Sequence, residues 1–111
     1  MKEDRPYLEH ILQSINKVQS YTLEGKEYFL QDTKTHDAVI RNFEIIGEAV
    51  KQLSDSVKAK QPHIRWRDIA GLRDILIHNY MGVNLYRVWN VIEKDLPSLK
   101  EAVEMLLHIP A

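Results

Sequence analysis

The sequence of 111 residues contains no cysteine, which excludes disulfide bonds and thiolate metal ligands. It also lacks any apolar run near the roughly 18 residues that a membrane-spanning helix needs. Residues 1–6 are polar, unlike the apolar core of a signal peptide. The four glycines and four prolines leave little room for flexible linkers. We therefore predict a single domain over residues 1–111, located in the cytoplasm.

A strong charge of either sign is missing as well, because the formal net charge is −1. Without a chain-wide basic field, any binding of nucleic acid must be local. The locally basic stretch is residues 58–67, in which Lys58, Lys60, Arg65 and Arg67 surround Trp66. This stretch is either a solvated connector or a rim that contacts the phosphates of single-stranded RNA, with Trp66 stacked on a base or buried.

Apolar residues recur at three- and four-residue intervals through most of the chain, which is typical of helices with one buried face. The first predicted helix starts near Asp4 and ends before Gly25, and Asp32 is a candidate cap for the second. The clearest apolar seam lies between residues 39 and 53. Residues 26–35 are predicted to form a single helical turn or a loop that plugs the bundle.

The last third of the chain continues this pattern, with Asn84 as a candidate cap and Pro97 as the start of a new helix. No stretch alternates with a period of two, so strands are not expected. The prediction is an all-α, up-and-down helical bundle of four main helices plus a short fifth. Gly47 lies inside the second helix, where it predicts close approach by another helix. Nearby charged residues form either a solvated ion-pair face or the border of a site: Arg41, Glu44 and Glu48.

The chemistry of the chain concentrates in residues 72–80, which are predicted to be helical. Arg73 offers a planar fork of donors that suits a phosphate. His78 can give or take a proton near neutral pH, and Asp74 lies one helical turn before it. Asn79 and Tyr80 follow directly, and Tyr80 supplies a phenolic hydroxyl. These residue types indicate phosphate binding combined with acid–base chemistry.

On a helical wheel, Ile69 and Leu72 share one side of this predicted helix, whereas His78 points almost directly away from that side. Gly71 lies near His78 on the wheel and leaves room for the backbone of another molecule. The wheel therefore predicts one face for the bundle and one for a second molecule.

The motif Arg73-x4-His78-x-Tyr80, together with the blocks at residues 38–49, 64–73 and 82–89, resembles the HepT-like members of the HEPN superfamily. These are ribonuclease toxins of prokaryotic toxin–antitoxin modules, and the resemblance spans nearly the whole chain. It implies a HEPN-like bundle and a metal-independent endoribonuclease that acts on RNA across a homodimer. Arg73 and His78 would be catalytic, with Asp74 and Asn79 in support.

The same resemblance implies a nucleotidyltransferase antitoxin of the MntA type as partner, which transfers AMP to Tyr80. No cofactor is expected, and no metal site, because the remaining histidines are scattered in the sequence: His10, His36, His63 and His108. Two other interpretations stay open. The chain could be a non-catalytic helical module that binds, or is modified by, such a partner. It could also be a bundle in which Asp74 and His78 form a surface pair, Arg73 donates to a salt bridge and Tyr80 packs on the core.

Overall fold

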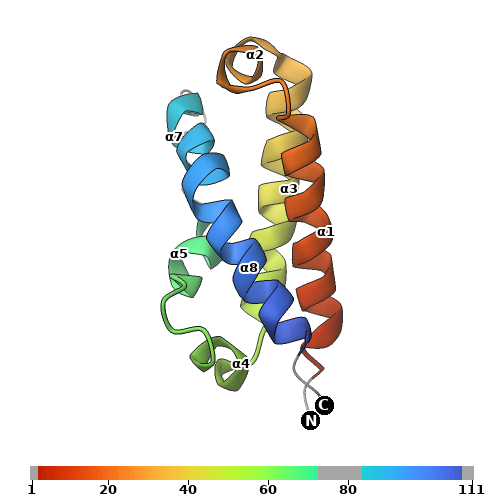
Figure 1. Cartoon of the computed structure of the whole chain (residues 1–111), viewed down its shortest axis with the longest axis vertical. Helices are drawn as coiled ribbons and strands as arrows, with labels where there is room; N and C mark the ends of the chain where they lie inside the picture. Colours follow the sequence, from red (N-terminus) through yellow and green to blue (C-terminus); the bar gives the residue numbers. More distant parts are fainter. Residues whose placement is uncertain (1–2, 73–83, 109–111) are drawn as a thin grey trace.

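The computed structural model describes residues 3–72 and 84–108. This part of the chain is helical without strands, which confirms the predicted all-α bundle (Figure 1). None of its helices combines the length and apolar character needed to cross a membrane. The elements are α1 (Arg5–Tyr21), α2 (Lys26–Gln31), α3 (Thr33–Gln52), α4 (Asp55–Ala59), α5 (Trp66–Ala70), α7 (Leu85–Asn90), the π-helical η1 (Val91–Asp95) and α8 (Leu96–Leu107).

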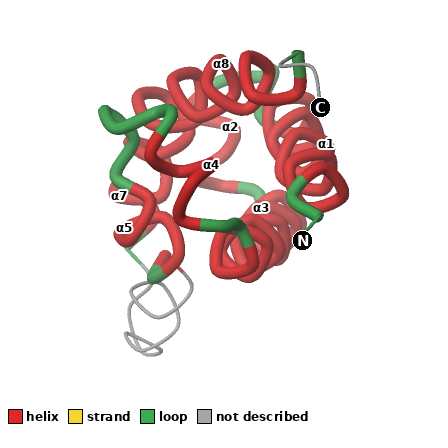
Figure 2. The backbone as a smooth tube through the Cα atoms, turned by 90° about the horizontal axis from the view of Figure 1, so that it is seen from below, coloured by secondary structure: helices red, strands yellow, loops and turns green. Residues whose placement is uncertain are grey.

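The molecule is elongated, with extents of 43 × 27 × 21 Å. Helices α1 and α3 run side by side in opposite directions, and α2 links them at one end (Figure 1). The blue helix of α7, η1 and α8 returns from that end toward both termini. Viewed along the bundle, α4 lies across the opposite end, between α1, α3 and α8 (Figure 2). The up-and-down arrangement therefore places α5 beside α3 and next to the last helix.

The core consists mainly of the apolar seams predicted from the sequence. The seam of α3 is fully buried at its centre, as is the matching seam of α1. Asp4 precedes α1 as predicted, but its side chain does not cap that helix. Its two carboxylate oxygens instead accept hydrogen bonds from the backbone N–H and the hydroxyl of Ser54, each at 2.7 Å. Asp4 thus ties the start of α1 to the start of α4.

The short helix α2 is the predicted plug. Phe29 is fully buried, and its ring contacts those of His36 and Trp89 at centroid distances of 5.1 and 5.5 Å. The Nε2 atom of His36 also contacts the carbonyl oxygen of Phe29. Asp32 caps α3 as predicted, because its carboxylate accepts from the N–H of Thr35 at 3.1 Å. Phe29 therefore joins α2, α3 and α7 at this end of the bundle.

The last helix is continuous from α7 to α8 rather than divided by a loop. Asn84 caps α7 as predicted, accepting from the N–H groups of Tyr86 and Arg87. Pro97 lies in the first turn of α8, but α8 follows η1 without a loop, so the separate helix predicted to start at Pro97 is instead a continuation of the last helix. The preceding segment η1 is π-helical, and the N–H of Leu96 donates to the carbonyl of Val91. The wider π turn lets the chain enter α8 without a break.

Near α5, the structure decides between the two alternatives for Trp66 and corrects one expectation about the following helix. The ring of Trp66 is buried rather than stacked on a base: it is 8% exposed, and its Nε1 donates to the carbonyls of Lys58 and Gln61, both at 3.1 Å. Its indole joins α4 to α5 because an apolar ring is more stable in the core than in water. The helix that contains Ile69 does not continue to Leu72. It ends at Ala70, and Gly71 adopts φ −88° and ψ 3°, outside the helical region.

Candidate functional site

The predicted catalytic residues Arg73, Asp74, His78, Asn79 and Tyr80 lie outside the described residues, as does Gly82. Their roles stay predictions. The structure does place the residues that lead into this motif, because Leu72, next to Arg73, is buried in the core at 8% exposure. The residues that precede the motif, α5 and Leu72, are therefore packed against the bundle.

Gly47 sets how close α5 lies to α3. A Cβ atom added to Gly47 would lie 3.2 Å from the carbonyl oxygen of Ala70 and 3.4 Å from that of Ile69. The prediction of a close helix approach at Gly47 is confirmed, and the approaching element is α5. Gly71 differs, because an added Cβ would meet only the carbonyl oxygens of Arg67 and Asp68 in its own turn, at 3.5 and 3.8 Å. The expected approach of a second molecule to Gly71 is not tested by this single chain.

A cleft of about 380 Å³ opens between α5 and the last helix. Its floor is apolar and mostly buried, whereas its rim is polar and mostly exposed. The floor consists of Ile46, Ile64, Ile69, Leu72, Val91, Leu96 and Leu99. The rim consists of His63, Arg65 and Asp68 on the α5 side, and of Arg87, Asp95 and Ser98 on the other side. We call this feature the α5–α8 cleft.

The charged groups of the α5–α8 cleft are unequally paired. Arg65 and Asp68 form an ion pair with 2.7 Å between Nη2 and Oδ2. The side chains of Arg87 and Asp95, by contrast, form no hydrogen bond or ion pair with other residues of the described ranges. Apart from His63, the charges of the two arginines and the two aspartates balance. The cleft therefore combines an apolar floor with free donors and acceptors, without a large net charge.

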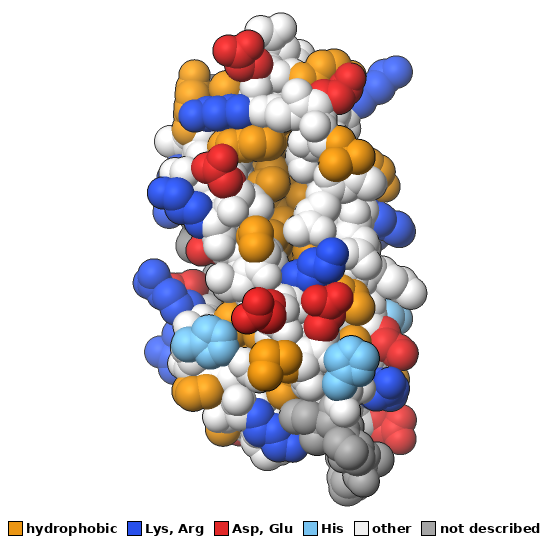
Figure 3. Space-filling view, in the orientation of Figure 1, with side chains coloured by type: hydrophobic (Ala, Val, Ile, Leu, Met, Phe, Trp, Pro, Cys, Tyr) orange, Lys and Arg blue, Asp and Glu red, His pale blue; other side chains and the backbone are white. Residues whose placement is uncertain are grey.

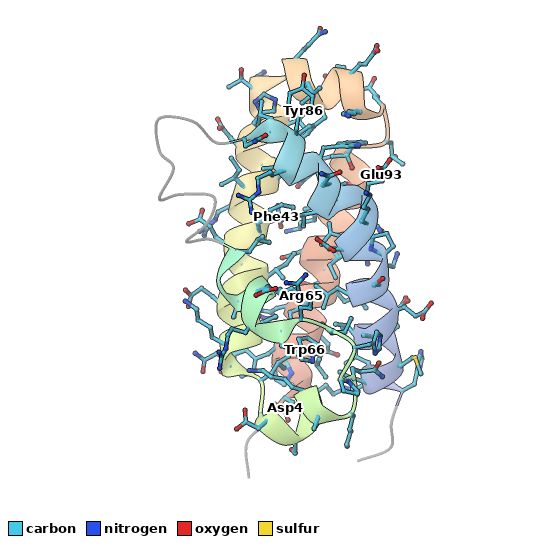
Figure 4. The ribbon with its side chains drawn as sticks, turned by 90° about the vertical axis from the view of Figure 1, so that its left-hand side faces the viewer. Asp4, Phe43, Arg65, Trp66, Tyr86 and Glu93 are labelled. Carbon is cyan, nitrogen blue, oxygen red and sulfur yellow. The ribbon has the colours of Figure 1, made fainter. Side chains whose placement is uncertain are left out.

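The candidate RNA contacts predicted from residues 58–67 are distributed over two elements. Arg65 lines the α5–α8 cleft and lies between α5 and the last helix, with Trp66 below it (Figure 4). Lys60 and Arg67 are exposed, and Lys58 is half-buried at the end of α4. On the face seen in Figure 3, cationic and acidic side chains alternate. Any RNA contact through these residues would therefore depend on local geometry rather than on a broad positive surface.

The second candidate border, around Arg41, Glu44 and Glu48, lines an open depression between α1 and α3. Glu48 and Lys51 form an exposed ion pair at 3.6 Å, in agreement with a solvated charged face. His10, from α1, is exposed beside it. Deeper in α3, Asn42 is buried and donates to the carbonyl of Ala38 at 2.8 Å, while its Oδ1 has no hydrogen-bond partner in the described structure.

In the described ranges, no group of three or more His, Cys, Asp or Glu side chains could hold a metal ion. Two side chains near α2 have shifted pKa values. The pKa of Asp32 is lowered, mainly by the hydrogen bond from the Thr35 hydroxyl. The pKa of Tyr28 is raised, mainly by the charge of Asp32 and then by that of Glu24.

An all-helical bundle in which an Arg-x4-His motif follows α5 belongs to the HEPN class of folds. A model of the family described as ribonuclease HepT-like matches residues 11–106. The chain therefore belongs to the HepT-like ribonuclease family, which confirms the resemblance inferred from the motif.

Curated relatives agree with this assignment. The chain is 46% identical to a Methanocaldococcus jannaschii protein named "Gamma-glutamylcyclotransferase and putative RNase", over 96% of this chain and 49% of that protein. It is 43% identical to a "Putative RNase" of Caldanaerobacter subterraneus, over 97% of both chains. It is also 43% identical to a "Probable ribonuclease HepT" of Thermococcus cleftensis, over 95% of this chain and 96% of that one. The chain thus spans about half of the first relative and nearly all of the other two. No solved structure matches significantly.

Proposed function

We propose that the protein is an endoribonuclease toxin that cleaves RNA without a metal ion, at a site built from two copies of the Arg73-x4-His78-x-Tyr80 motif. The observation that carries this proposal is membership of the HepT-like ribonuclease family over residues 11–106, a range that includes the complete motif. The described fold is compatible with it, because it is an all-helical bundle in which the residues that precede the motif, α5 and Leu72, pack against the core.

The proposed reaction is attack by a ribose 2′-hydroxyl on the adjacent phosphate. One His78 takes the proton of the 2′-hydroxyl, the new 2′-oxygen–phosphorus bond forms, and the bond from phosphorus to the 5′-oxygen breaks. The second His78 protonates the leaving 5′-oxygen, while Arg73 binds the phosphate oxygens. Asp74 and Asn79 would orient these groups. Positioned acid–base catalysis is worth about 10²- to 10⁴-fold, which suits a slow nuclease.

The proposed homodimer follows from the need for two histidines at one phosphate. A single chain supplies one His78, so a base and an acid of the same type require a second copy. Two coupled imidazoles would also give a bell-shaped dependence of the cleavage rate on pH. Beside His78, the carboxylate of Asp74 would favour the protonated imidazole.

The decisive experiment compares purified wild type with His78→Ala and Arg73→Ala on a defined RNA in the presence of EDTA. Wild type should cleave and leave a cyclic phosphate, whereas both variants should lose activity. A substrate with one 2′-deoxyribose at the cleaved position is the matched control and should resist cleavage at that position. Equal cleavage by wild type and His78→Ala, or a flat rate between about pH 5 and 9, would rule out the two-histidine mechanism.

For regulation, we propose that a nucleotidyltransferase antitoxin of the MntA type transfers AMP to the hydroxyl of Tyr80. The added phosphate would compete with RNA for Arg73 without unfolding the bundle. Coexpression followed by intact-mass measurement should show AMP-sized increments that disappear in Tyr80→Phe.

The alternative, a non-catalytic interaction module, makes a different prediction. In that case Arg73→Ala and His78→Ala variants that still bind the partner would remain as toxic in cells as wild type. Loss of toxicity with retained binding would exclude the alternative.

A further inference from the structure

The α5–α8 cleft is not explained by the motif chemistry, although it adjoins the motif in the chain. Leu72 forms part of its floor and directly precedes Arg73. A group bound in this cleft would therefore lie against the last residue before the proposed phosphate-binding arginine. This continuity points to a ligand that is part of, or resembles, the RNA substrate.

The dimensions of the cleft suit a small ligand. Its volume of about 380 Å³ lies within the roughly 300–1,000 Å³ of small-molecule sites. Buried side chains such as Leu96 and Leu99 make the floor apolar, which favours contact with an apolar or aromatic ring. The π-helical segment η1 contributes Val91 and Asp95 to the lining, and π turns often occur at functional sites.

The chemistry of the rim narrows the ligand class. Arg87 carries donors for a phosphate or for base acceptors, and Asp95 can accept from base N–H groups. Neither side chain has a partner in the described structure, so no existing hydrogen bond or ion pair of Arg87 or Asp95 must be broken when a ligand binds. Because positive and negative groups balance, an isolated phosphate gains little from the cleft. A nucleotide, which offers a ring, base N–H groups and a phosphate together, satisfies both walls and the floor.

We propose that the α5–α8 cleft is a nucleotide-binding subsite that holds one base and its phosphate of the RNA beside the cleaved bond. This inference rests on the proposed ribonuclease function for the identity of the natural ligand. It assigns Arg87 and Asp95 as the residues that discriminate among bases, whereas the apolar floor accepts any planar ring.

The test is a titration of the isotope-labelled full chain with AMP, GMP, CMP and UMP, and with inorganic phosphate, followed by methyl NMR signals of Ile64, Leu96 and Leu99. At least one nucleotide should give saturable shifts at these methyl groups, and phosphate should not. Arg87→Gln and Asp95→Asn should each weaken that binding about tenfold or more, as expected for loss of a hydrogen bond to a charged group.

Matched controls are available on the same helix. Lys94→Gln and Glu93→Gln remove the same charges from exposed positions that do not line the cleft, and they should bind like wild type. Folding is not expected to obscure the result, because the Arg87 and Asp95 side chains are exposed and unpaired. Several results would overturn the proposal: no nucleotide binding, equal binding of phosphate, unchanged binding by the cleft variants, or a cleft covered by the second copy in the dimer.

RNA cleavage by the same proteins separates this inference from the proposed function. Cleavage that depends on His78, without nucleotide binding in the cleft, would refute the subsite and leave the ribonuclease proposal intact. Nucleotide binding in the cleft without any cleavage dependent on His78 would refute the ribonuclease proposal. If both hold, Arg87→Gln should change which sequences are cut while the remaining cleavage still requires His78.

Discussion

The contact between Gly47 and α5 makes a sharp prediction, because it joins a position inside the core to the helix that precedes the proposed catalytic motif in the chain. In Gly47→Leu, a side chain must enter a space where even a Cβ atom would lie 3.2 Å from the carbonyl oxygen of Ala70. Overpacking of this kind costs about 1–3 kcal/mol. Leucine is a better helix former than glycine by somewhat less than about 1 kcal/mol, so the expected net destabilisation reaches about 2 kcal/mol.

Stability and activity should respond differently to this change. A loss of about 1 kcal/mol lowers the midpoint of thermal unfolding by roughly 4 °C in a domain of this size. Because α5 leads directly to Leu72 and Arg73, its displacement should also misplace the motif, and a shift of about 1 Å can cost about 100-fold in rate. We therefore expect kcat/KM for RNA cleavage to fall in Gly47→Leu by more than the loss of folded protein explains.

Two milder variants serve as controls. In Gly47→Ala, the gain in helix propensity of about 1 kcal/mol opposes a contact that α5 can relieve by moving a few tenths of an ångström, so stability should change little. In Gly71→Ala, the added Cβ makes only ordinary contacts within the chain, at 3.5 Å or more, and the stability of the folded chain should change little. Identical unfolding of Gly47→Leu and Gly71→Ala would refute the proposed role of Gly47.

Three further predictions concern the bundle. Trp66→Phe should lower the free energy of unfolding in urea by only about 1 kcal/mol, because the carbonyls of Lys58 and Gln61 keep their backbone donors. Trp66→Ala should lower it by about 3–5 kcal/mol, because the apolar ring is lost from the core. Similar losses of stability in the two variants would contradict the burial of the ring. Asp4→Ala should cost about 1–2 kcal/mol, and Asp4→Asn should recover only part of this loss, as measured by thermal unfolding. The folded-state pKa of Asp32 lies below its ordinary value, so its stabilising contribution is complete above about pH 4 and is lost as the pH falls through the folded pKa. Asp32→Asn should therefore unfold earlier than wild type at pH 7, and this difference should shrink as the pH falls below the ordinary titration range of an aspartate; a difference that stays equal as the pH falls would exclude this linkage.

Much of the fold could be predicted because helical periodicity and caps are local signals. The α3 seam from Val39 to Leu53 is buried as its spacing requires, and Asp32 and Asn84 cap the helices that they precede. The short helix α4 is not evident from periodicity because five residues cover little more than one turn. Its usable signal is Ser54, whose hydroxyl accepts from the N–H of Val57.

The sequence was less informative about α5 and the site. Gly71 is compatible with a helix interior, a turn or a helix end, so the sequence alone does not show that the helix ends at Ala70. The sequence left open whether Trp66 stacks on a base or is buried, and the structure shows that its ring packs in the core. The α5–α8 cleft joins residues 63–72 to residues 87–99, and no local pattern reveals that these segments face each other.

The π-helical turn η1 has a consequence for how this chain tolerates insertions and deletions. A π turn contains one residue more than an α turn, so deletion of one residue between Val91 and Asp95 could be absorbed by tightening the turn. The apolar residues of α8 would keep their orientation toward α1, whereas the same deletion within α3 would rotate half of its seam away from the core. Val91 and Asp95, which line the α5–α8 cleft, both lie in η1. Deletion of one codon in this segment would therefore change the lining of the cleft, and with it the proposed ligand preference, while the bundle stays folded.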